Sequence, residues 1–212
     1  THTLNVNKSV TKLAARGKRA LLQLVGVLSK LGVVGPHMFF KLFDTQIQPI
    51  LLYGSEIWGC KQYNTIERIH LLACKKFLNV GVSTPNNMVY GECGRFPLYI
   101  ISFSRCLKYW CKILHMPEHR LPKKAYNMNV HLDNIGKITW ATSVRNILFT
   151  YGFGFVWISQ TVGDINMFIR YFRSRAVDIF KQDWNSSLYE SSRYECYRQF
   201  KSLLEPELYL SN

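Results

Sequence analysis

The sequence predicts an all-α protein: a multi-helix bundle in which a larger helical domain is followed by a smaller helical subdomain. Apolar residues recur at helical spacing in one segment after another, and no segment of useful length shows the alternation of a half-buried strand. Hydrophobic residues make up 48% of the 212, which favours a packed core over disorder. The longest apolar stretch, residues 147–159, is shorter than the ~20 residues that a membrane span needs.

Residues 8–31 give the clearest amphipathic helix. At about 100° per residue, one face collects the apolar or small residues Leu13, Gly17, Leu21, Leu24, Leu28 and Leu31. The opposite side collects the basic residues Lys8, Lys12, Arg16, Arg19 and Lys30. The segment contains no acidic residue that would balance them. We expect the apolar line to pack against other helices and the basic stripe to face outward.

Three helical segments are expected next. Gly35-Pro36 opens the first, because proline suits the first turn of a helix. Asn64 and Glu67 have the spacing of a capping box, which predicts a second helix at about 64–79. A turn-rich stretch at 83–97 follows, and we expect one short helix inside it.

Pro97 begins the next long helix, which we expect to end at about His115. Its buried stripe consists of Phe103, Leu107, Trp110 and Leu114. Its opposite face carries Arg105, Lys108 and Lys112. This is the second helix with an apolar face and a basic face set back to back.

Residues 116–139 contain two prolines and show weak periodicity, so they are the best candidate for a boundary. We therefore assign a basic helical domain to residues 1–122 and a C-terminal helical subdomain to residues 123–212. Within the subdomain we expect helices at about 140–151, 164–184 and 189–204.

The stretch IQPILLYGSEIWG, residues 47–59, combines a proline, two glycines and two large aromatic residues. The proline removes one helical hydrogen bond and predicts a kink. The first glycine lets another backbone come close, and the second suits a helix C-terminus. Apolar side chains point all round, so we expect the stretch to be core. Its structural signature is Pro49, Tyr53, Gly54, Trp58 and Gly59.

No motif for catalysis or metal binding is visible in this segment. The aspartates stand apart, whereas polymerase or nuclease chemistry needs clustered carboxylates to hold two metal ions. The cysteine and histidine spacing does not match a zinc site, and no nucleophile motif occurs. The six cysteines do not resemble a secreted disulfide framework, and most fall in apolar helical patterns, so we expect buried reduced thiols in an intracellular protein.

Charge is the strongest functional signal in the composition. The chain has 27 basic and 13 acidic residues, and 19 of the basic against 6 of the acidic lie in residues 1–140. A basic front half predicts a polyanionic partner, held through phosphate contacts that do not read sequence. The candidate nucleic-acid-binding residues are Lys8, Lys12, Arg16, Arg19, Lys75, Lys76, Arg105, Lys108 and Lys112.

Several long motifs resemble one family in order along nearly the whole chain. They are KLFDTQIQPILLYGSEIWG, IERIHLLACKKFLNVGVSTPNNMVYGECGRFPL, LKYWCKIL, TWATSVRNIL, GFGFVW and FRSRAVDIFKQDWNSSLYESSRYECYRQFK. They resemble the region after the polymerase core in LINE-type, non-long-terminal-repeat retrotransposon reverse transcriptases, jockey-like elements among them. The chain opens without a methionine, and we expect it to be a segment of a longer polyprotein.

The resemblance implies a helical thumb followed by a C-terminal region that grips the RNA template and DNA primer. The implied partners are therefore nucleic acid and the upstream polymerase core of the parent polyprotein, whose activity is that of an RNA-directed DNA polymerase. Magnesium would be needed only in that core, and no cofactor is expected in this segment. The implied localisation is intracellular, in the nucleus and cytoplasm.

Two other interpretations remain open from the residues alone. Basic amphipathic helices also suit anionic lipid surfaces, which would make the chain a peripheral membrane module. A helical protein-interaction scaffold is favoured if the net charge of +14 is spread evenly in three dimensions.

Overall fold

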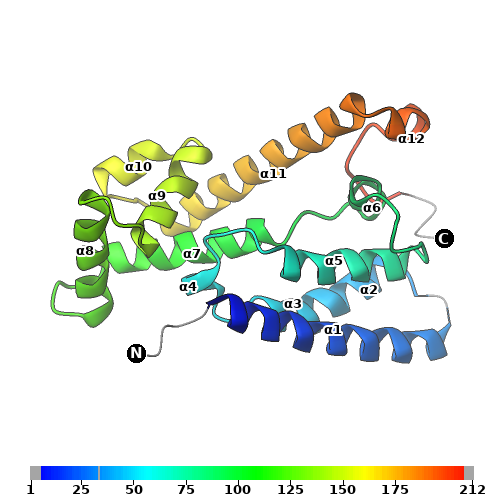
Figure 1. Ribbon diagram of the computed structural model, residues 1–212, viewed down its shortest axis with the longest axis horizontal. Helices are drawn as coiled ribbons and strands as arrows, with labels where there is room; N and C mark the ends of the chain where they lie inside the picture. Colours follow the sequence, from blue (N-terminus) through cyan, green and yellow to red (C-terminus); the bar gives the residue numbers. More distant parts are fainter. Residues whose placement is uncertain (1–5, 33, 208–212) are drawn as a thin grey trace. The chain divides into compact units, whose positions relative to one another are not determined.

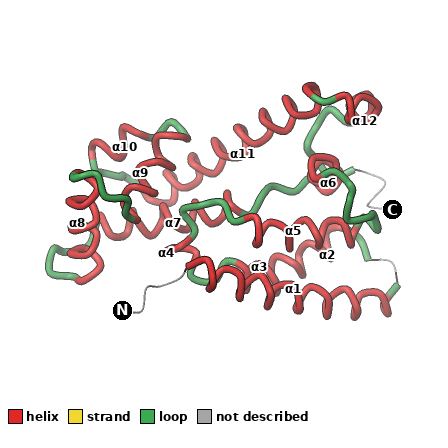
Figure 2. Tube along the Cα trace, in the orientation of Figure 1, coloured by secondary structure: helices red, strands yellow, loops and turns green. Residues whose placement is uncertain are grey.

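The computed structural model describes residues 6–32 and 34–207, and these residues form helices joined by loops, with no strand among them (Figures 1 and 2). The predicted all-α class is confirmed. The chain packs as two compact units. Of the described residues, the first unit contains 6–32, 34–53, 63–98 and 179–207, and the second contains 54–62 and 99–178. The predicted boundary at 122/123 falls inside the second unit.

The first unit is built on α1 (Val6–Leu31), which packs against α5 (Asn64–Phe77) and α3 (Gln48–Leu51). Its buried face consists of Val10, Ala14, Gly17, Leu21, Leu24 and Leu28. The predicted apolar line is therefore largely correct, except that Leu13 is half-buried and Leu31 is exposed. Helix α1 approaches α3 closely at Gly17, where a Cβ atom would overlap Cδ2 of Leu51 and lie 2.9 Å from its Cγ.

Helical structure continues from α2 (Pro36–Leu42) into α3 through a π-helical turn at Phe43–Ile47. Pro49 has no backbone N–H and its ring would clash with the carbonyl four residues earlier in a regular α-helix. The wider turn comes directly before that proline, and Gln48 N–H bonds to the carbonyl of Phe43. A π turn is one of the recognised ways in which a helix accommodates such a defect.

The short helix expected at 83–97 is α6 (Asn86–Cys93), and the C-terminal part of the chain packs on it. Trp184, in the second half of α11 (Ile165–Glu190), donates from Nε1 to the carbonyl of Asn87 at 2.8 Å. Tyr197, in α12 (Glu195–Phe200), donates to Oε1 of Glu92 at 2.7 Å. Gly91 makes this packing possible, because a Cβ there would lie 2.9 Å from Cζ2 of Trp184.

The second unit is built on α7 (Tyr99–Leu114), which packs against α4 (Ser55–Trp58), α8 (Leu121–Asn134) and α9 (Trp140–Thr150). Trp110 is fully buried and donates from Nε1 to the hydroxyl of Tyr126 at 3.0 Å. Its ring stacks on Trp157 of α10 (Gly154–Ser159), with centroids 6.0 Å apart.

Cys60 and Cys106 form a disulfide in this unit, with Cα atoms 6.2 Å apart. The expectation of buried reduced thiols is therefore wrong for this pair. Cys74, Cys93 and Cys111 are buried free thiols, as expected, and Cys196 is an exposed one. The two paired positions are 46 residues apart, so spacing along the sequence carried no sign that α7 brings them together.

Three other local expectations need correction. The helix at 64–77 has Tyr63 at its N-cap without a side-chain cap, so the predicted capping box is absent. The segment 116–139 contains a full helix, α8, because Pro122 lies in its first turn, where proline is tolerated. The helix expected at 189–204 is reduced to Ser192–Tyr194 and α12, since α11 continues to Glu190.

Candidate nucleic-acid interface

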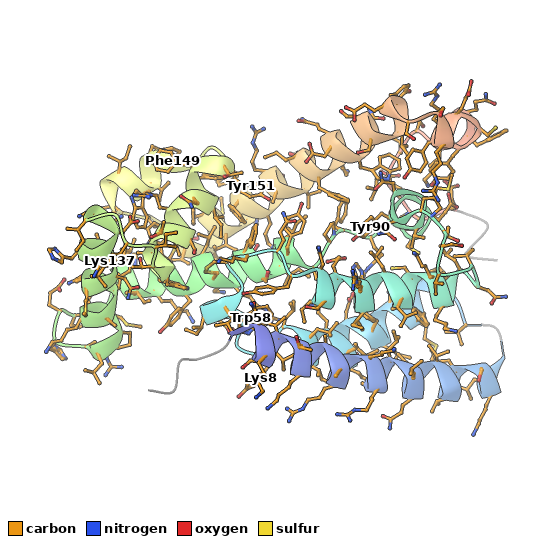
Figure 3. All side chains as sticks on the ribbon, in the orientation of Figure 1. Lys8, Trp58, Tyr90, Lys137, Phe149 and Tyr151 are labelled. Carbon is orange, nitrogen blue, oxygen red and sulfur yellow. A yellow bond between two sulfur atoms is a disulfide. The ribbon has the colours of Figure 1, made fainter. Side chains whose placement is uncertain are left out.

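The outward side of α1 carries four of the predicted residues, which we call the α1 basic face: Lys8, Lys12, Arg16 and Arg19. All four are exposed and lie opposite the buried face of the helix; Figure 3 shows Lys8 projecting from its outer side. At a rise of about 1.5 Å per residue they cover roughly 16 Å of helix. In the described part of the chain, Lys12, Arg16 and Arg19 form no ion pair with a carboxylate.

Lys75 and Lys76 do not share one environment. Lys76 is exposed near the end of α5. Lys75 is only 9% exposed, and its ammonium group donates to the carbonyl of Val82 at 2.8 Å. Burial also lowers the pKa of Lys75 from its ordinary value. Its ammonium group thus holds the loop at 79–85 against α5, and of the nine candidates it is the least available to a ligand.

The basic residues of α7 belong to the second unit, whereas the α1 basic face belongs to the first. Lys108 and Lys112 are exposed, and Arg105 is half-buried. Phe103, Leu107 and Trp110 are buried on the other side of the helix, as predicted, and Leu114 is half-buried. Each basic stripe therefore lies within a single unit.

Net charge is divided evenly between the two units. The first contains 15 basic and 8 acidic residues and the second 12 and 5, so each carries +7. The contrast between a basic front half and a neutral back half holds along the sequence only, because residues 99–140, which contain 7 basic and 2 acidic residues, belong to the second unit. Charge is concentrated at the level of single helices: α1 has six basic residues and no acidic one.

The stretch at 47–59 is core only in part, which corrects the expectation. Leu51, Leu52 and Ser55 are buried, but Tyr53 is 76% exposed and Ile57 59% exposed, while Trp58 is half-buried. A segment whose apolar side chains point in all directions exposes one side unless neighbouring elements cover it. The short helix α4 is covered mainly by α7, so its other side is exposed.

The first glycine of the stretch has a different role from the one expected, and the second has the expected role together with a further one. Gly54 has φ +67°, a left-handed conformation that costs glycine little, and no backbone atom lies within 4 Å of a Cβ built there. Gly59 ends α4, as predicted, and it is the position of close approach: a Cβ there would lie 2.9 Å from Cβ of Ser102 in α7.

The first unit contains a partly buried polar network that the sequence did not predict. Glu67 accepts three hydrogen bonds of 2.7 Å, from His70 Nδ1, the Tyr90 hydroxyl and the Leu98 backbone N–H. Arg95 donates from Nε to Nε2 of His70 at 3.5 Å and makes a two-fold hydrogen bond to Asp44, with Nη1 2.9 Å from Oδ2. Glu67 and His70 are three residues apart on α5, but nothing in the sequence links them to Asp44 or Arg95.

The charges in this network compensate each other. Burial alone would raise the pKa of Glu67, but His70 and the hydrogen bonds from Tyr90 and Leu98 hold it below its ordinary value. Burial would likewise lower the pKa of Arg95, but Asp44 raises it. The guanidinium also lies over the ring of Phe40, 4.9 Å from its centroid. Because these polar groups are already paired, the network is suited to holding α5 and α6 together.

Other kinds of site find little support in residues 6–32 and 34–207. Burial raises the pKa of the Cys74 thiol well above its ordinary value, so this thiol is protonated and a poor nucleophile near neutral pH. No group of three or more His, Cys, Asp or Glu side chains there is arranged to hold a metal ion. Among the same residues, no helix has the length and apolar character to cross a membrane.

Comparisons with protein-family models, with curated protein sequences and with solved structures find no match to this chain.

Proposed function

We propose that the chain is a nucleic-acid-binding helical module whose α1 basic face contacts the phosphates of a duplex. In the sense implied by the reverse-transcriptase resemblance, the duplex is the template paired with its primer, and the chemistry is carried out by an upstream polymerase core. This segment contributes grip and no catalytic group.

The observation that supports the proposal is the arrangement of α1. Basic side chains face outward over several turns, the helix contains no acid, and its other face is buried, so the stripe has a fixed outward orientation. A cationic stripe on a rigid helix attracts polyanions and makes binding depend on salt. Such contacts position a backbone without selecting a sequence.

A salt titration of duplex binding tests the proposal. Four phosphate contacts would give log K against log salt a slope of about −3.6 on a B-form duplex, at roughly 0.9 per contact. The triple variant Lys12→Gln, Arg16→Gln, Arg19→Gln should flatten that slope by about two to three units. It should retain its helical circular dichroism and thermal melt, because the three positions are exposed.

A matched triple variant separates local contact from net charge. Lys41→Gln, Arg68→Gln, Arg193→Gln removes the same charge from exposed positions on other elements of the same unit. Its slope should change by less than about one unit. Equal slopes for the two triple variants would show that α1 is a solvated helix face, and the proposal would be rejected.

A helical protein-interaction scaffold is the second candidate, because the net charge is shared equally between the two units. A scaffold of this kind would show no salt-dependent affinity for duplexes of random sequence. The wild-type titration therefore distinguishes the two candidates directly.

A further inference from the structure

The first half of α11 presents an aromatic and basic surface in the second unit. Ile169, Phe172 and Ala176 are buried on one side of the helix. On the other side Tyr171 is 60% exposed, with the exposed Arg170 and Arg175 beside it. In the described part of the chain, these three exposed side chains make no hydrogen bond, ion pair or ring contact.

Aromatic rings extend this surface onto α10. Phe155 is 68% exposed and lies 6.4 Å, between ring centroids, from Phe153. Phe153 meets Phe168 of α11 edge to face at 5.5 Å. Phe168 and Tyr171 are three residues apart on one helix and so lie on neighbouring turns of the same face. We call Phe155, Phe153, Phe168 and Tyr171 the aromatic ridge; its two ends are exposed rings.

We propose that the aromatic ridge binds a single-stranded nucleic acid, with bases stacked on Tyr171 and Phe155 and phosphates held by the arginines of α11. Exposed rings spaced along a basic surface are how proteins hold single strands without reading sequence, since every base has a face that can stack. The proposal relies on the proposed function only for the class of ligand, and it adds a second surface with a preference for unpaired strands.

Charge along α11 favours an anionic strand over a neutral ligand. Arg170, Arg173 and Arg175 lie within six residues, and no acidic residue occurs between Ile165 and Val177. Asp164 is occupied at the helix start, where Oδ1 accepts from the N–H of Met167 at 2.6 Å. At about 100° per residue, Arg175 lies some 40° from Tyr171 and Arg170 about 100° on its other side. Cations therefore flank the exposed ring on both sides.

The test measures anisotropy of a labelled single-stranded oligonucleotide and of a labelled duplex with each variant. Tyr171→Ala should weaken single-strand binding about tenfold or more, as loss of one stacked base does, whereas Tyr171→Phe should stay within about twofold of wild type. Arg170→Gln, Arg175→Gln should weaken single-strand binding and flatten its salt dependence. Tyr189→Ala is the matched control, because Tyr189 is an exposed tyrosine of the same helix that lies beneath Arg198.

The outcomes distinguish this inference from the proposed function. Suppose that duplex binding depends on the α1 basic face but single-strand binding is unchanged by Tyr171→Ala. This result would reject the aromatic-ridge proposal and support the proposed function. Suppose instead that the wild type binds no duplex and that Tyr171→Ala loses single-strand binding. This result would support the aromatic-ridge proposal and reject the proposed function. No binding of either ligand overturns both. Vesicles with anionic lipids serve as a third ligand, and Tyr171-dependent binding to vesicles alone would overturn the ridge in favour of a membrane surface.

Discussion

Glu67 illustrates how one side chain acquires a role that its position in the sequence does not reveal. Its spacing from Asn64 suggests a cap for its own helix. In the fold it turns away from the helix start and accepts hydrogen bonds from α5, from α6 and from the backbone at Leu98. A capping box satisfies two backbone donors, whereas this carboxylate accepts hydrogen bonds from three donors, two of them on side chains. Hydrogen bonds to residues distant in the sequence therefore take the place of the local capping motif.

Glu67→Gln should lower the free energy of unfolding by about 2–4 kcal/mol at pH 7, because an amide offers one acceptor oxygen and turns an N–H group toward donors. The pKa of Glu67 is held below its ordinary value in the folded state, so its carboxylate stabilises the fold above the unfolded pKa of about 4.3. That contribution is lost as the pH falls through the folded pKa. Urea unfolding of both proteins should show the difference shrinking below about pH 4.

Glu190→Gln provides the control for this pH series, because Glu190 is exposed at the end of α11. Its unfolding free energy should follow that of wild type at every pH. A Glu67→Gln variant that also follows wild type at pH 7 would mean that the three hydrogen bonds add nothing net to stability.

At the scale of elements, prediction from sequence succeeded where one helix buries one continuous face. The bounds of α1 and α7 agree with the predicted segments to within about two residues at each end, because their apolar residues recur over several turns. It failed at α8, where only Tyr126 and Asp133 are buried and no apolar stripe exists. The same periodicity that identifies the buried face of α1 also places its basic residues on the outward side. Lys75 could not be placed, because its acceptor, the carbonyl of Val82, depends on a loop.

The packing of α1 on α3 should respond sharply to Gly17→Ala. The new Cβ overlaps the Leu51 side chain, which is fully buried and cannot move into solvent. We expect thermal or chemical unfolding to show a free energy of unfolding that is lower by about 1–2 kcal/mol, because overpacking outweighs the gain in helix propensity. Gly26→Ala on the same helix, with no atom within 4 Å, should instead gain about 0.5–1 kcal/mol. A gain for both variants would contradict the close approach of α1 and α3.

For the whole molecule, the order of segments along the chain differs from their grouping in space. Periodicity identifies each helix but carries no information on which distant segment a helix meets, so it cannot show that each unit is assembled from separate stretches of the chain. The chain leaves the first unit after Tyr53, returns at Tyr63, leaves again after Leu98 and returns at Ile179. The same route explains why charge that is uneven along the sequence is even between units.

The Cys60–Cys106 disulfide lies where this route leaves and re-enters the second unit, on either side of the excursion through residues 63–98. The bond restricts the conformations of the unfolded chain by closing a loop across a sequence separation of 46 residues. In the loop-entropy treatment, this restriction raises the free energy of unfolding by about 4 kcal/mol. Urea unfolding under reducing conditions, or of the double variant Cys60→Ser, Cys106→Ser, should therefore show a loss of that order. Cys196→Ser, at an exposed free thiol, should change neither stability nor its response to reductant. If alkylation and mass measurement of the unreduced protein find six free thiols, the bond does not form in solution and no loss on reduction is expected.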